Sequence, residues 1–363
     1  MAGPKVLIVG AGATGLTAAV ELARHGVVPR IIDRDSGPTP LSKAVGIGSH
    51  TLEVLEPSGV AERLLAKGQR IRKVHIYSEG EELGALDFHA LSHRFNFLLS
   101  LPQSETEGVL AEALDELGVE VEWRTPLVKL EAGADGAVAV IDEPGCGERS
   151  TVWDVVLGAD GADSTVRHQA GFRFDGYTHH RIWSIADIEV DAWPHDPSTA
   201  QAFLSDDGDI AFVIPIGRDR HRAVSNTPDA LAHVPGQFAL RRIERTDTFH
   251  LPIRQADSYQ KDSVFLAGDA AHVHSPIGAR GMNLGVEDAA CFATRLVEGR
   301  LDGYSAERRP VGRRWIGLSE RLLSAAQAQN GAAVLARNLA LRIVGHAPWI
   351  QRPILQRVAG LVE

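Results

Sequence analysis

The distribution of apolar residues predicts a β-α-β unit at the start of the chain. Lys5 to Val9 is a nearly continuous apolar run, as expected for a buried strand, and a glycine-rich stretch follows it directly. Leu16 to His25 has helical spacing and is closed by Gly26, and Val28 to Ile32 is a second apolar run. This order of strand, helix and strand is typical of a dinucleotide-binding fold.

Later apolar runs predict a larger α/β sheet and a second, different sheet. Val155 to Leu157 and Val264 to Ala267 are short apolar runs that lead into glycine and aspartate, as strands of the first sheet would. From Ile182 the chain changes to short alternating runs separated by turn residues, which indicate antiparallel strands. The expected strands of this meander are Gln201 to Leu204, Ile210 to Ile216 and His221 to Ser225, with Lys73 to Ser78 as an added strand.

The predicted fold class is therefore α/β: a Rossmann-like domain with an inserted, mainly antiparallel β-sheet and a helical carboxyl-terminal segment. We expect residues 1–72, 97–177 and 257–363 to form the first domain, and residues 73–96 and 178–256 to form the inserted substrate domain. The helical segment from Ser305 onward is expected to return and cover the first domain.

Shorter helices are predicted between these strands. Ser49 to Leu55 and Val60 to Lys67 have helical patterns separated by a proline-glycine break. Ser104 and Glu107 have the spacing of a capping box, which predicts that a helix begins there and ends at Gly118.

Composition and charge narrow the class of protein. A chain of 363 residues with 44% hydrophobic content can bury a large core, and its net charge of -10 argues against a nucleic-acid or anionic-membrane surface. Two distant cysteines, Cys146 and Cys291, give neither a disulfide framework nor a thiolate metal site. The start of the chain lacks the pattern of a signal peptide and no apolar stretch approaches about 20 residues, so the expected location is the cytoplasm, with no membrane partner.

The first candidate site is the glycine turn after the first strand. Gly10-Ala11-Gly12-Ala13-Thr14-Gly15 matches GxGxxG, in which Gly10 allows a tight turn, Gly12 the close approach of a pyrophosphate and Gly15 the helix-strand contact. Asp33 ends the second strand, where an acid binds an adenosine ribose. The motif predicts tightly bound FAD or NAD.

Two further stretches place aspartates at the ends of buried strands. In Gly158 to Arg167, Asp160 either binds a ligand hydroxyl or caps the next helix, and Arg167 is expected to meet phosphate. In Val264 to Asn283, Gly268-Asp269 precedes a glycine-rich loop whose helix begins near Met282. A carboxylate for sugar-like hydroxyls and a helix N-terminus for a developing anion suit a flavin.

Taken together and in this order, the three motifs resemble the FAD-dependent aromatic hydroxylases of the p-hydroxybenzoate hydroxylase fold, the class A flavoprotein monooxygenases. The resemblance covers nearly the whole chain and implies that FAD is bound by the following residues: Gly10, Gly12, Ala13, Thr14, Gly15, Asp33, Arg34, Lys43, Gln103, Val128, Asp160, Arg167, Gly268, Asp269, Pro276, Gly278, Gly281, Met282 and Asn283. Within this set the family uses the Asp33-Arg34 pair at the ribose, Gln103 beside the flavin, Val128 at adenine and Asp269 at the ribityl chain.

Two departures from the family pattern concern basic residues. The flavin loop reads Gly278-Ala279-Arg280-Gly281 where members commonly have a glutamine, so Arg280 either stabilises reduced flavin or a substrate phenolate, or points to solvent. Members often carry arginine at the position of Lys43, and a lysine cannot form the bidentate fork of a guanidinium. Arg280 and Pro276 are the candidate catalytic residues, and no acid or base is identified.

The resemblance implies an FAD-dependent monooxygenase. NADH or NADPH, bound transiently, would reduce FAD, and dioxygen would form a flavin C4a-hydroperoxide. One oxygen would pass to an aromatic or polycyclic phenolic substrate, such as a polyketide-type compound of antibiotic biosynthesis. The expected oligomeric state is a monomer or homodimer. No metal is expected, since His272 and His274 lack a third ligand nearby in sequence.

Three other functions stay open at this point. A reductase or dehydrogenase of the same fold would need no oxygen, and only its products distinguish it. A flavin halogenase would be expected to carry WxWxIP, and the nearest match, Ile210 to Pro215, has neither tryptophan. A redox-silent flavin-fold binding protein would hold FAD without turnover. Trp183, Phe203 and Phe212 are expected either to line an aromatic pocket or to pack in the core.

Overall fold

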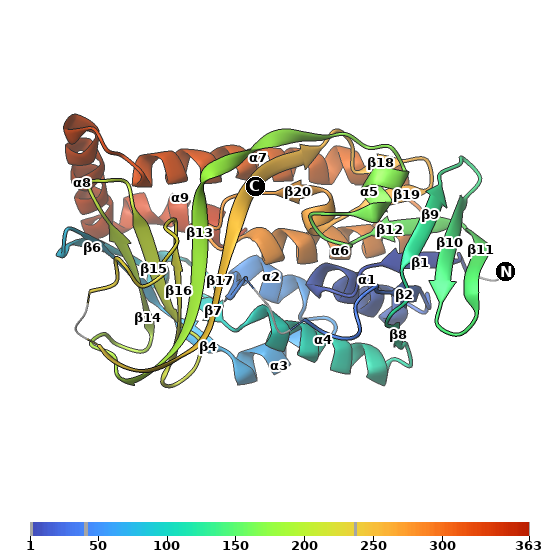
Figure 1. Cartoon of the computed structure of the whole chain (residues 1–363), viewed down its shortest axis with the longest axis horizontal. Coiled ribbons are helices and arrows are strands. Elements are labelled where there is room, and N and C mark those ends of the chain that lie inside the picture. The colour runs from blue at the N-terminus through green and yellow to red at the C-terminus, as the bar shows by residue number, and fades with distance from the viewer. Residues whose placement is uncertain (1–2, 40–42, 236–237, 363) are drawn as a thin grey trace.

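The computed structural model describes residues 3–39, 43–235 and 238–362. A mostly parallel sheet with helices lies at one end of the elongated molecule, and a large antiparallel sheet lies at the other (Figure 1). This arrangement confirms the predicted fold class.

The first sheet has six strands in the spatial order β18-β19-β12-β1-β2-β8, and only β18 is antiparallel to its neighbour. The strands are Gln260–Lys261 (β18), Val264–Leu266 (β19), Val155–Gly158 (β12), Val6–Val9 (β1), Arg30–Ile32 (β2) and Val121–Glu122 (β8). Since β1 continues through helix α1 to β2 on one side and has β12 on the other, the strand order reverses at β1, which is where α/β sheets bind ligands.

The inserted sheet has eight strands in the order β20-β17-β13-β16-β15-β14-β5-β6. The strands are His272–Val273 (β20), Ala239–Ala256 (β17), Phe174–Ala192 (β13), Arg220–Ser225 (β16), Ile210–Pro215 (β15), Thr199–Leu204 (β14), Lys73–Ser78 (β5) and Glu81–Asp87 (β6). The predicted meander and its added strand β5 are confirmed. The long strands β13 and β17 run between the two ends of the molecule (Figure 1).

Two small sheets complete the strands. One consists of Leu127–Glu131 (β9), Ala137–Glu143 (β10) and Gly147–Trp153 (β11), and the other of Gly46–Ile47 (β3), Leu98–Ser100 (β7) and Gln69–Ile71 (β4).

The helices cover both sheets. They are Ala13–Arg24 (α1), Ser49–Val54 (α2), Val60–Lys67 (α3), Gln103–Glu116 (α4), Thr165–Gln169 (α5), Gly281–Val297 (α6), Tyr304–Ala326 (α7), Gly331–His346 (α8) and Pro348–Val358 (α9), with short 3-10 turns at Phe88–Ala90 (η1), Gly268–Ala270 (η2) and Leu301–Gly303 (η3). The largest hydrophobic core joins β1, β12 and β19 to α1 and α6.

The carboxyl-terminal helices correct one expectation. Helix α7 runs along the first domain, whereas α8 packs against β6 of the inserted sheet, and α9 lies near η1 and ends beside α2, where the Ala359 carbonyl accepts from the His50 amide. A Cβ on Gly84 of β6 would lie 2.8 Å from the Cα of Gly345, so the two backbones touch. The helical segment therefore spans both parts of the molecule.

The predicted capping box at Ser104 is wrong. Helix α4 begins one residue earlier, after Pro102, and no side chain caps it. The Glu107 carboxylate instead accepts hydrogen bonds from the Ala13 amide at 3.2 Å and from Gln103 Nε2 at 2.8 Å. The Glu107 side chain, which local spacing assigns to a capping box, therefore binds the backbone of α1 instead.

Candidate functional site

Strand register brings the predicted motifs to one edge of the first sheet. Val9 pairs with both Ile32 and Gly158, and Gly158 pairs with Leu266. Because these strands are parallel, the residues that follow them emerge at the same carboxyl edge. The structure thus gathers the glycine turn, Asp33, Asp160 and Asp269, although up to 236 residues separate Asp33 from Asp269.

The three glycines of the first turn differ in how much space surrounds them. Gly10 has φ of 105°, and a Cβ there would lie 2.4 Å from the Ala159 carbonyl oxygen. A Cβ on Gly15 would lie 1.8 Å from the Gly10 carbonyl oxygen. At Gly12 the nearest atom is Glu107 Oε1 at 3.6 Å, an ordinary contact. Gly10 and Gly15 are required by packing, whereas a Cβ at Gly12 would fit without a clash.

Helix α1 packs closely on the turn that carries Asp269. A Cβ added to Gly268 or Gly285 would lie 2.5 Å or 2.3 Å from Thr14 Oγ1. Thr14 therefore positions α1 against η2 and α6, and the Ala13 amide binds Glu107. The Ala13 amide is therefore bound to a side chain of the protein, and the Thr14 side chain packs against Gly268 and Gly285.

The Asp33 carboxylate holds the glycine turn. Its oxygens accept hydrogen bonds from the Ala11 amide at 2.7 Å and the Asp35 amide at 2.8 Å. Each oxygen keeps a second lone pair for a ribose hydroxyl. The neighbouring Arg34 is exposed to solvent.

Asp160 and Arg167 stabilise α5 and its contact with η2. Asp160 accepts hydrogen bonds from the Ser164 hydroxyl at 2.5 Å and the Val166 amide at 3.0 Å, so it supports the start of the helix, and burial raises its pKa. The Arg167 guanidinium donates to the carbonyls of Ala162 and Ala270 at 2.7 and 3.1 Å and is buried. Backbone carbonyls thus bind two of the five donors of the Arg167 guanidinium, and its contact with phosphate stays a prediction.

Asp269 differs from these aspartates because its carboxylate has no hydrogen-bond partner within residues 3–39, 43–235 and 238–362. The residue is accessible to solvent, yet desolvation by the surrounding protein raises the pKa of its carboxyl. The positive charges of His272 and Lys43 oppose that increase. The Lys43 ammonium lies 4.8 Å from the centroid of the Phe249 ring on β17. An accessible, unpaired carboxylate at this edge is suited to bind ligand hydroxyls.

The loop before α6 is built for close packing. A Cβ on Gly278, which has φ of 87°, would lie 2.7 Å from Trp315, and Ala279 is also left-handed with φ of 53°. Asn283 in the first turn of α6 accepts from the Gly48 amide and donates to the carbonyls of Gly46 and Ala279. Three contacts thus fix the loop that contains Pro276, and the start of α6 at Gly281 and Met282, against β3.

Arg280 neither points to solvent nor has a free charge. Its guanidinium is buried and binds both oxygens of Glu287 at 2.7 and 2.9 Å. This pairing excludes the solvent-exposed alternative and neutralises the charge expected beside the ring. The sequence contained a signal for it, since Glu287 lies seven residues along the same helix.

Gln103 lies on α4, which packs against α1, and Val128 lies on β9, which contacts α5. Gln103 begins α4, and its backbone N–H donates to the Ala44 carbonyl at 3.0 Å. Val128 is the extra residue where the β9–β10 register shifts, so the ladder does not pair it. Such a bulge leaves backbone groups available to a ligand.

His272 and His274 are held by other side chains rather than arranged as metal ligands. His272 Nε2 lies 2.7 Å from Asp288 Oδ2, and Trp315 donates to His274 Nδ1 at 3.2 Å. Burial lowers the pKa of His274 to about 3, so this imidazole is neutral near pH 7.

Several residues of the site gave no signal in the sequence. Arg222 on β16 is buried, binds both oxygens of Asp187 at 2.6 and 2.7 Å, and donates to the carbonyl of Lys43 at 3.1 Å. This pair ties the segment with Lys43 to the inserted sheet. The partners are 35 residues apart, and only strand pairing brings them together.

The aromatic residues of the inserted sheet do not form one pocket. Trp183 and Phe212 belong to the cluster that also contains Phe249 and Ile277, whereas Phe203 packs in a cluster on the other face. The face with Trp183 is the one toward the flavin loop.

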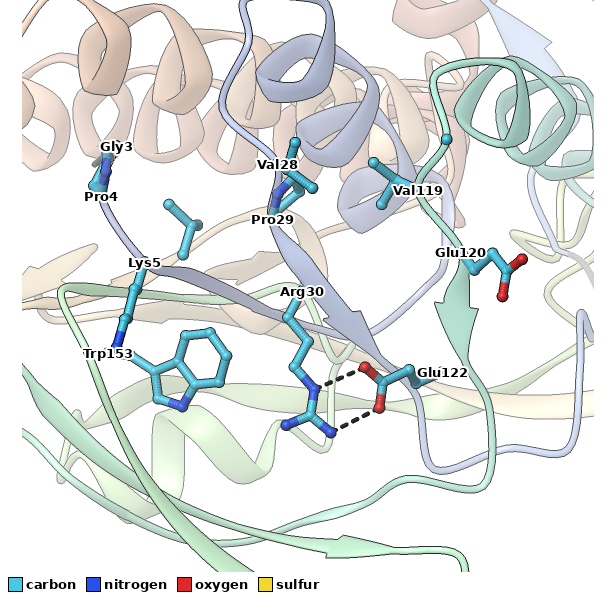
Figure 2. A pocket seen from close by; sticks show the side chains of 12 residues that line it. Gly3, Pro4, Lys5, Val28, Pro29, Arg30, Val119, Glu120, Glu122 and Trp153 are labelled. Carbon is cyan, nitrogen blue, oxygen red and sulfur yellow. Dashed lines mark hydrogen bonds and ion pairs between the residues drawn. The ribbon is translucent and has the colours of Figure 1, made fainter. Parts of the chain in front are cut away.

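A separate cavity lies at the opposite, amino edge of the first sheet. Figure 2 shows this space of about 450 Å³, bordered by Lys5, Arg30, Glu122 and Trp153. Arg30 binds both oxygens of Glu122 at 2.8 and 2.7 Å, so these charges already have partners. The cavity is distant from the predicted motifs and gives no second candidate site.

The carboxyl edge of the first sheet fits FAD. A glycine with room for a Cβ, a carboxylate without a hydrogen-bond partner in the described ranges, and the N-terminus of the 17-residue helix α6 meet there. A site of this composition can hold a pyrophosphate, a polyol chain and a ring that gains negative charge.

Comparisons with known proteins identify the family. The family described as FAD binding domain matches residues 4–233 and 227–319. A 6-methylpretetramide 4-monooxygenase from Streptomyces rimosus is 32% identical over 389 residues, which cover 99% of this chain and 69% of that protein. The chain therefore belongs to the family of FAD-dependent aromatic hydroxylases with the p-hydroxybenzoate hydroxylase fold.

Solved structures agree with this assignment. The p-nitrophenol 4-monooxygenase from Pseudomonas putida DLL-E4 has a TM-score of 0.88 and 24% identity, with 98% of this chain and 97% of that chain covered, and shows the shared fold. An anhydrotetracycline hydroxylase from Streptomyces rimosus has a TM-score of 0.83 and 29% identity, with 100% of this chain and 77% of that chain covered. The chain is a flavin-dependent monooxygenase, and its cofactor is FAD.

In the part of the chain that the structure describes, none of the helices combines the length and the apolar character needed to cross a membrane.

Proposed function

We propose that this monooxygenase uses NADH or NADPH and dioxygen to hydroxylate an aromatic or polycyclic phenolic compound, of the polyketide type found in antibiotic biosynthesis. The compounds in the names of its relatives, 6-methylpretetramide and anhydrotetracycline, support this substrate class. When bound, FAD takes a hydride from the nicotinamide and activates dioxygen.

The position of the Lys43 ammonium is the observation that carries this proposal. Its ammonium lies over the Phe249 ring of the inserted sheet, and its charge acts on Asp269 of the first domain. A cation at the junction of the two domains, beside an apolar sheet face, would hold a phenolate oxygen near the flavin loop. Arg222 and Asp187 fix the backbone from which Lys43 extends.

We assign the remaining site residues by their surroundings. Asp269 would accept hydrogen bonds from the ribityl hydroxyls, Gly12 would face the pyrophosphate and Asp33 the adenosine ribose. Pro276 and Gly278 would border the flavin, and the α6 N-terminus at Gly281 and Met282 would stabilise negative charge on the reduced ring. Gln103 and Val128 would complete the binding surface.

The reaction is tested by mass spectrometry of products formed with FAD, NADPH or NADH, and isotopically labelled dioxygen. A panel of phenols and polycyclic polyketides should yield at least one product with a single labelled oxygen. A reduced product without label would favour a reductase of the same fold. If no compound were changed and none accelerated the oxidation of NADPH or NADH, the proposal would be contradicted.

The assignment of Asp269 is tested separately by Asp269→Ala. Loss of a charged hydrogen-bond acceptor should weaken FAD binding by about 1.5–3 kcal/mol, measured as the Kd by fluorescence titration. Asp302 is a matched control, since it is an exposed aspartate at the centre of another 3-10 turn, η3. Equal Kd values for the two alanine variants would remove Asp269 from the site.

A further inference from the structure

Two neighbouring carboxylates on α6 hold the two turns that we assign to FAD. Glu287 and Asp288 are both buried and lie two turns into the helix. Asp288 binds the turn with Asp269, and Glu287 binds the residue that precedes α6.

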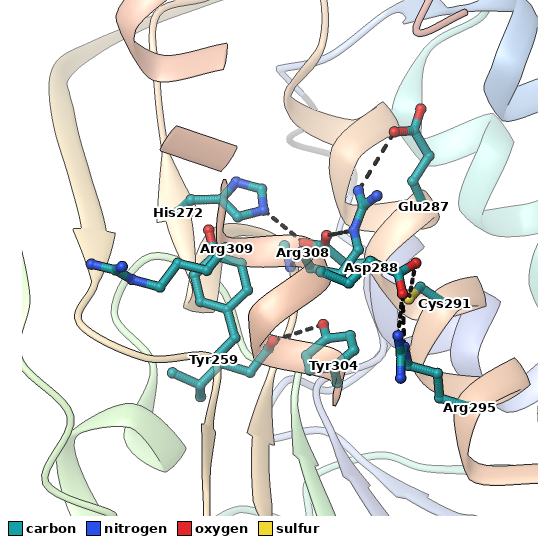
Figure 3. Close-up of polar contacts among 12 residues, drawn as sticks. Tyr259, His272, Glu287, Asp288, Cys291, Arg295, Tyr304, Arg308 and Arg309 are labelled. Atoms are coloured by element: carbon teal, nitrogen blue, oxygen red, sulfur yellow. Dashed lines mark hydrogen bonds and ion pairs between the residues drawn. The ribbon is translucent and has the colours of Figure 1, made fainter. Parts of the chain in front are cut away.

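Asp288 contacts the Asp269 turn on both sides. Its Oδ2 atom accepts from the Gly268 amide at 3.1 Å. The same atom lies 2.7 Å from His272 Nε2 (Figure 3). Gly268 directly precedes Asp269, and His272 follows three residues later. One carboxylate thus closes the turn that aims the Asp269 side chain.

Glu287 fixes the start of α6 in the same way. Its carboxylate binds the Arg280 guanidinium through two hydrogen bonds and accepts one from the Thr51 hydroxyl at 3.2 Å. Arg280 is the residue immediately before α6 and ends the flavin loop.

Arg308 on α7 is the positive charge common to both carboxylates. Its Nε atom donates to Asp288 Oδ1 at 2.7 Å, and its Nη2 atom lies 3.6 Å from Glu287 Oε2. Figure 3 shows its guanidinium between the two acids. Burial alone would raise the pKa of Asp288, but Arg308 and His272 outweigh it and keep that pKa below its ordinary value.

The buried group contains charges of both signs: the Arg280 and Arg308 guanidinium groups lie beside the Glu287 and Asp288 carboxylates. Removal of Arg308 would take a buried positive charge away from these carboxylates, beneath a site that takes an anionic dinucleotide.

We propose that Arg308 is a positioning residue for FAD: through Asp288 and Glu287 it holds the Asp269 turn and the start of α6 at a fixed separation. This rests on the proposed assignment of these two turns to FAD. In this role the buried Arg308 guanidinium acts through the two carboxylates rather than on the ligand.

The test compares Arg308→Met with Arg295→Met. Arg295 is a matched control because it also joins α6 to α7, through Glu307, but contacts neither turn. Arg308→Met should raise the Kd for FAD about tenfold or more, as loss of a group that orients a ligand-binding residue does, and Arg295→Met should leave it within about twofold. Urea unfolding without FAD separates this effect from lost stability.

Two further readouts respond to charge and geometry rather than to folding. The midpoint potential of bound flavin should become more negative in Arg308→Met, since the loss of a positive charge disfavours the reduced anion. Arg308→Lys, which keeps the charge, should restore most of the potential but only part of the affinity. If Arg308→Met fails to fold, the nearly isosteric Asp288→Asn should still weaken FAD binding.

Several results would overturn the proposal. They are an unchanged Kd for FAD in Arg308→Met, a loss no larger than that of Arg295→Met, or a normal Kd in Asp288→Asn. Asp269→Ala distinguishes this failure from failure of the site assignment. Weak binding in Asp269→Ala with normal binding in Arg308→Met rejects the role of Arg308 alone, whereas the reverse pattern rejects the ribityl contact and supports positioning through α6.

Discussion

At the scale of single residues, the structure divides the predicted site into groups that can face a ligand and groups that support them. Asp269 and Gly12 have space or unpaired polar atoms on the ligand side. Arg167 and Arg280 are conspicuous in the sequence, but their guanidinium groups are buried against protein acceptors. A side chain's chemistry could be predicted from its position in a motif, whereas its partner could not.

The glycines of the first turn allow a direct test of this division. Gly12→Ala should leave the stability of the FAD-free protein unchanged, because Gly12 has φ of -75° and its Cβ would have an ordinary contact, yet it should weaken FAD binding. Gly15→Ala should destabilise the fold by about 1–3 kcal/mol or more through its clash with Gly10. Urea unfolding and FAD titration of both variants measure the two effects, and equal destabilisation by both would refute the distinction.

The buried His221 side chain should make the free energy of unfolding depend on pH. It is buried beside Trp193, with ring centroids 4.6 Å apart, and burial lowers its pKa to about 4. The unfolded chain, with an ordinary histidine pKa of about 6.5, binds more protons between these values. The free energy of unfolding should therefore fall as pH drops from about 6.5 to about 4, by about 3 kcal/mol from this residue.

Urea unfolding at several pH values checks this contribution in the wild type and in His221→Gln. The difference in unfolding free energy between the two proteins should shrink as the pH falls through this window. A constant difference would show that His221 does not titrate as inferred.

At the scale of elements, helix starts show where local sequence signals hold and where distant contacts replace them. Ser164 caps α5 by accepting from the Arg167 amide at 2.9 Å, in agreement with a local rule. Ser104 has an equally good local pattern, but Glu107 binds α1 and the helix begins before it. The competing hydrogen bond comes from the Ala13 amide on α1. Because this donor lies outside α4, residue spacing along α4 gives no sign of it.

Serine-to-alanine changes at these two helices should therefore have different costs. Ser164→Ala should destabilise the protein by about 1 kcal/mol, the usual value of a lost N-cap. Ser104→Ala should stay within about 0.5 kcal/mol of the wild type, as a surface change without a cap does. Urea unfolding of both variants gives the comparison, and a larger cost at Ser104 would restore the capping box.

At the scale of the whole molecule, the first domain and the inserted sheet are joined by shared elements. The strands β13 and β17 run through both regions, and α7 carries Arg308 at the flavin turn and Leu323 in a hydrophobic cluster of the inserted sheet. Arg222 adds a polar link to the segment with Lys43. These connections indicate that the two regions unfold together.

FAD should consequently stabilise the inserted sheet as well as the first domain. At about 100 times its Kd, FAD should add about 2.7 kcal/mol to the free energy of unfolding. Fluorescence of Trp183 and Trp193, both on or beside the inserted sheet, and far-ultraviolet circular dichroism should shift to the same higher urea midpoint. A tryptophan transition that FAD leaves unchanged would mean that the inserted sheet unfolds independently.

The sequence by itself determined the α/β fold, the inserted meander, the three nucleotide-binding motifs and the family. These depend on local periodicity, on glycines with special backbone requirements and on motif order, all of which lie within short stretches of chain. The tertiary structure alone decided that Asp269 has no hydrogen-bond partner among the described residues, that backbone carbonyls bind Arg167 while a carboxylate binds Arg280, and that α8 lies on the inserted sheet. The physical reason is that hydrogen bonds and ion pairs form between whichever groups the fold brings within about 3 Å of each other. Strand packing brings Arg222 to Asp187, and helix packing brings Arg308 to Asp288, whatever their separation along the chain.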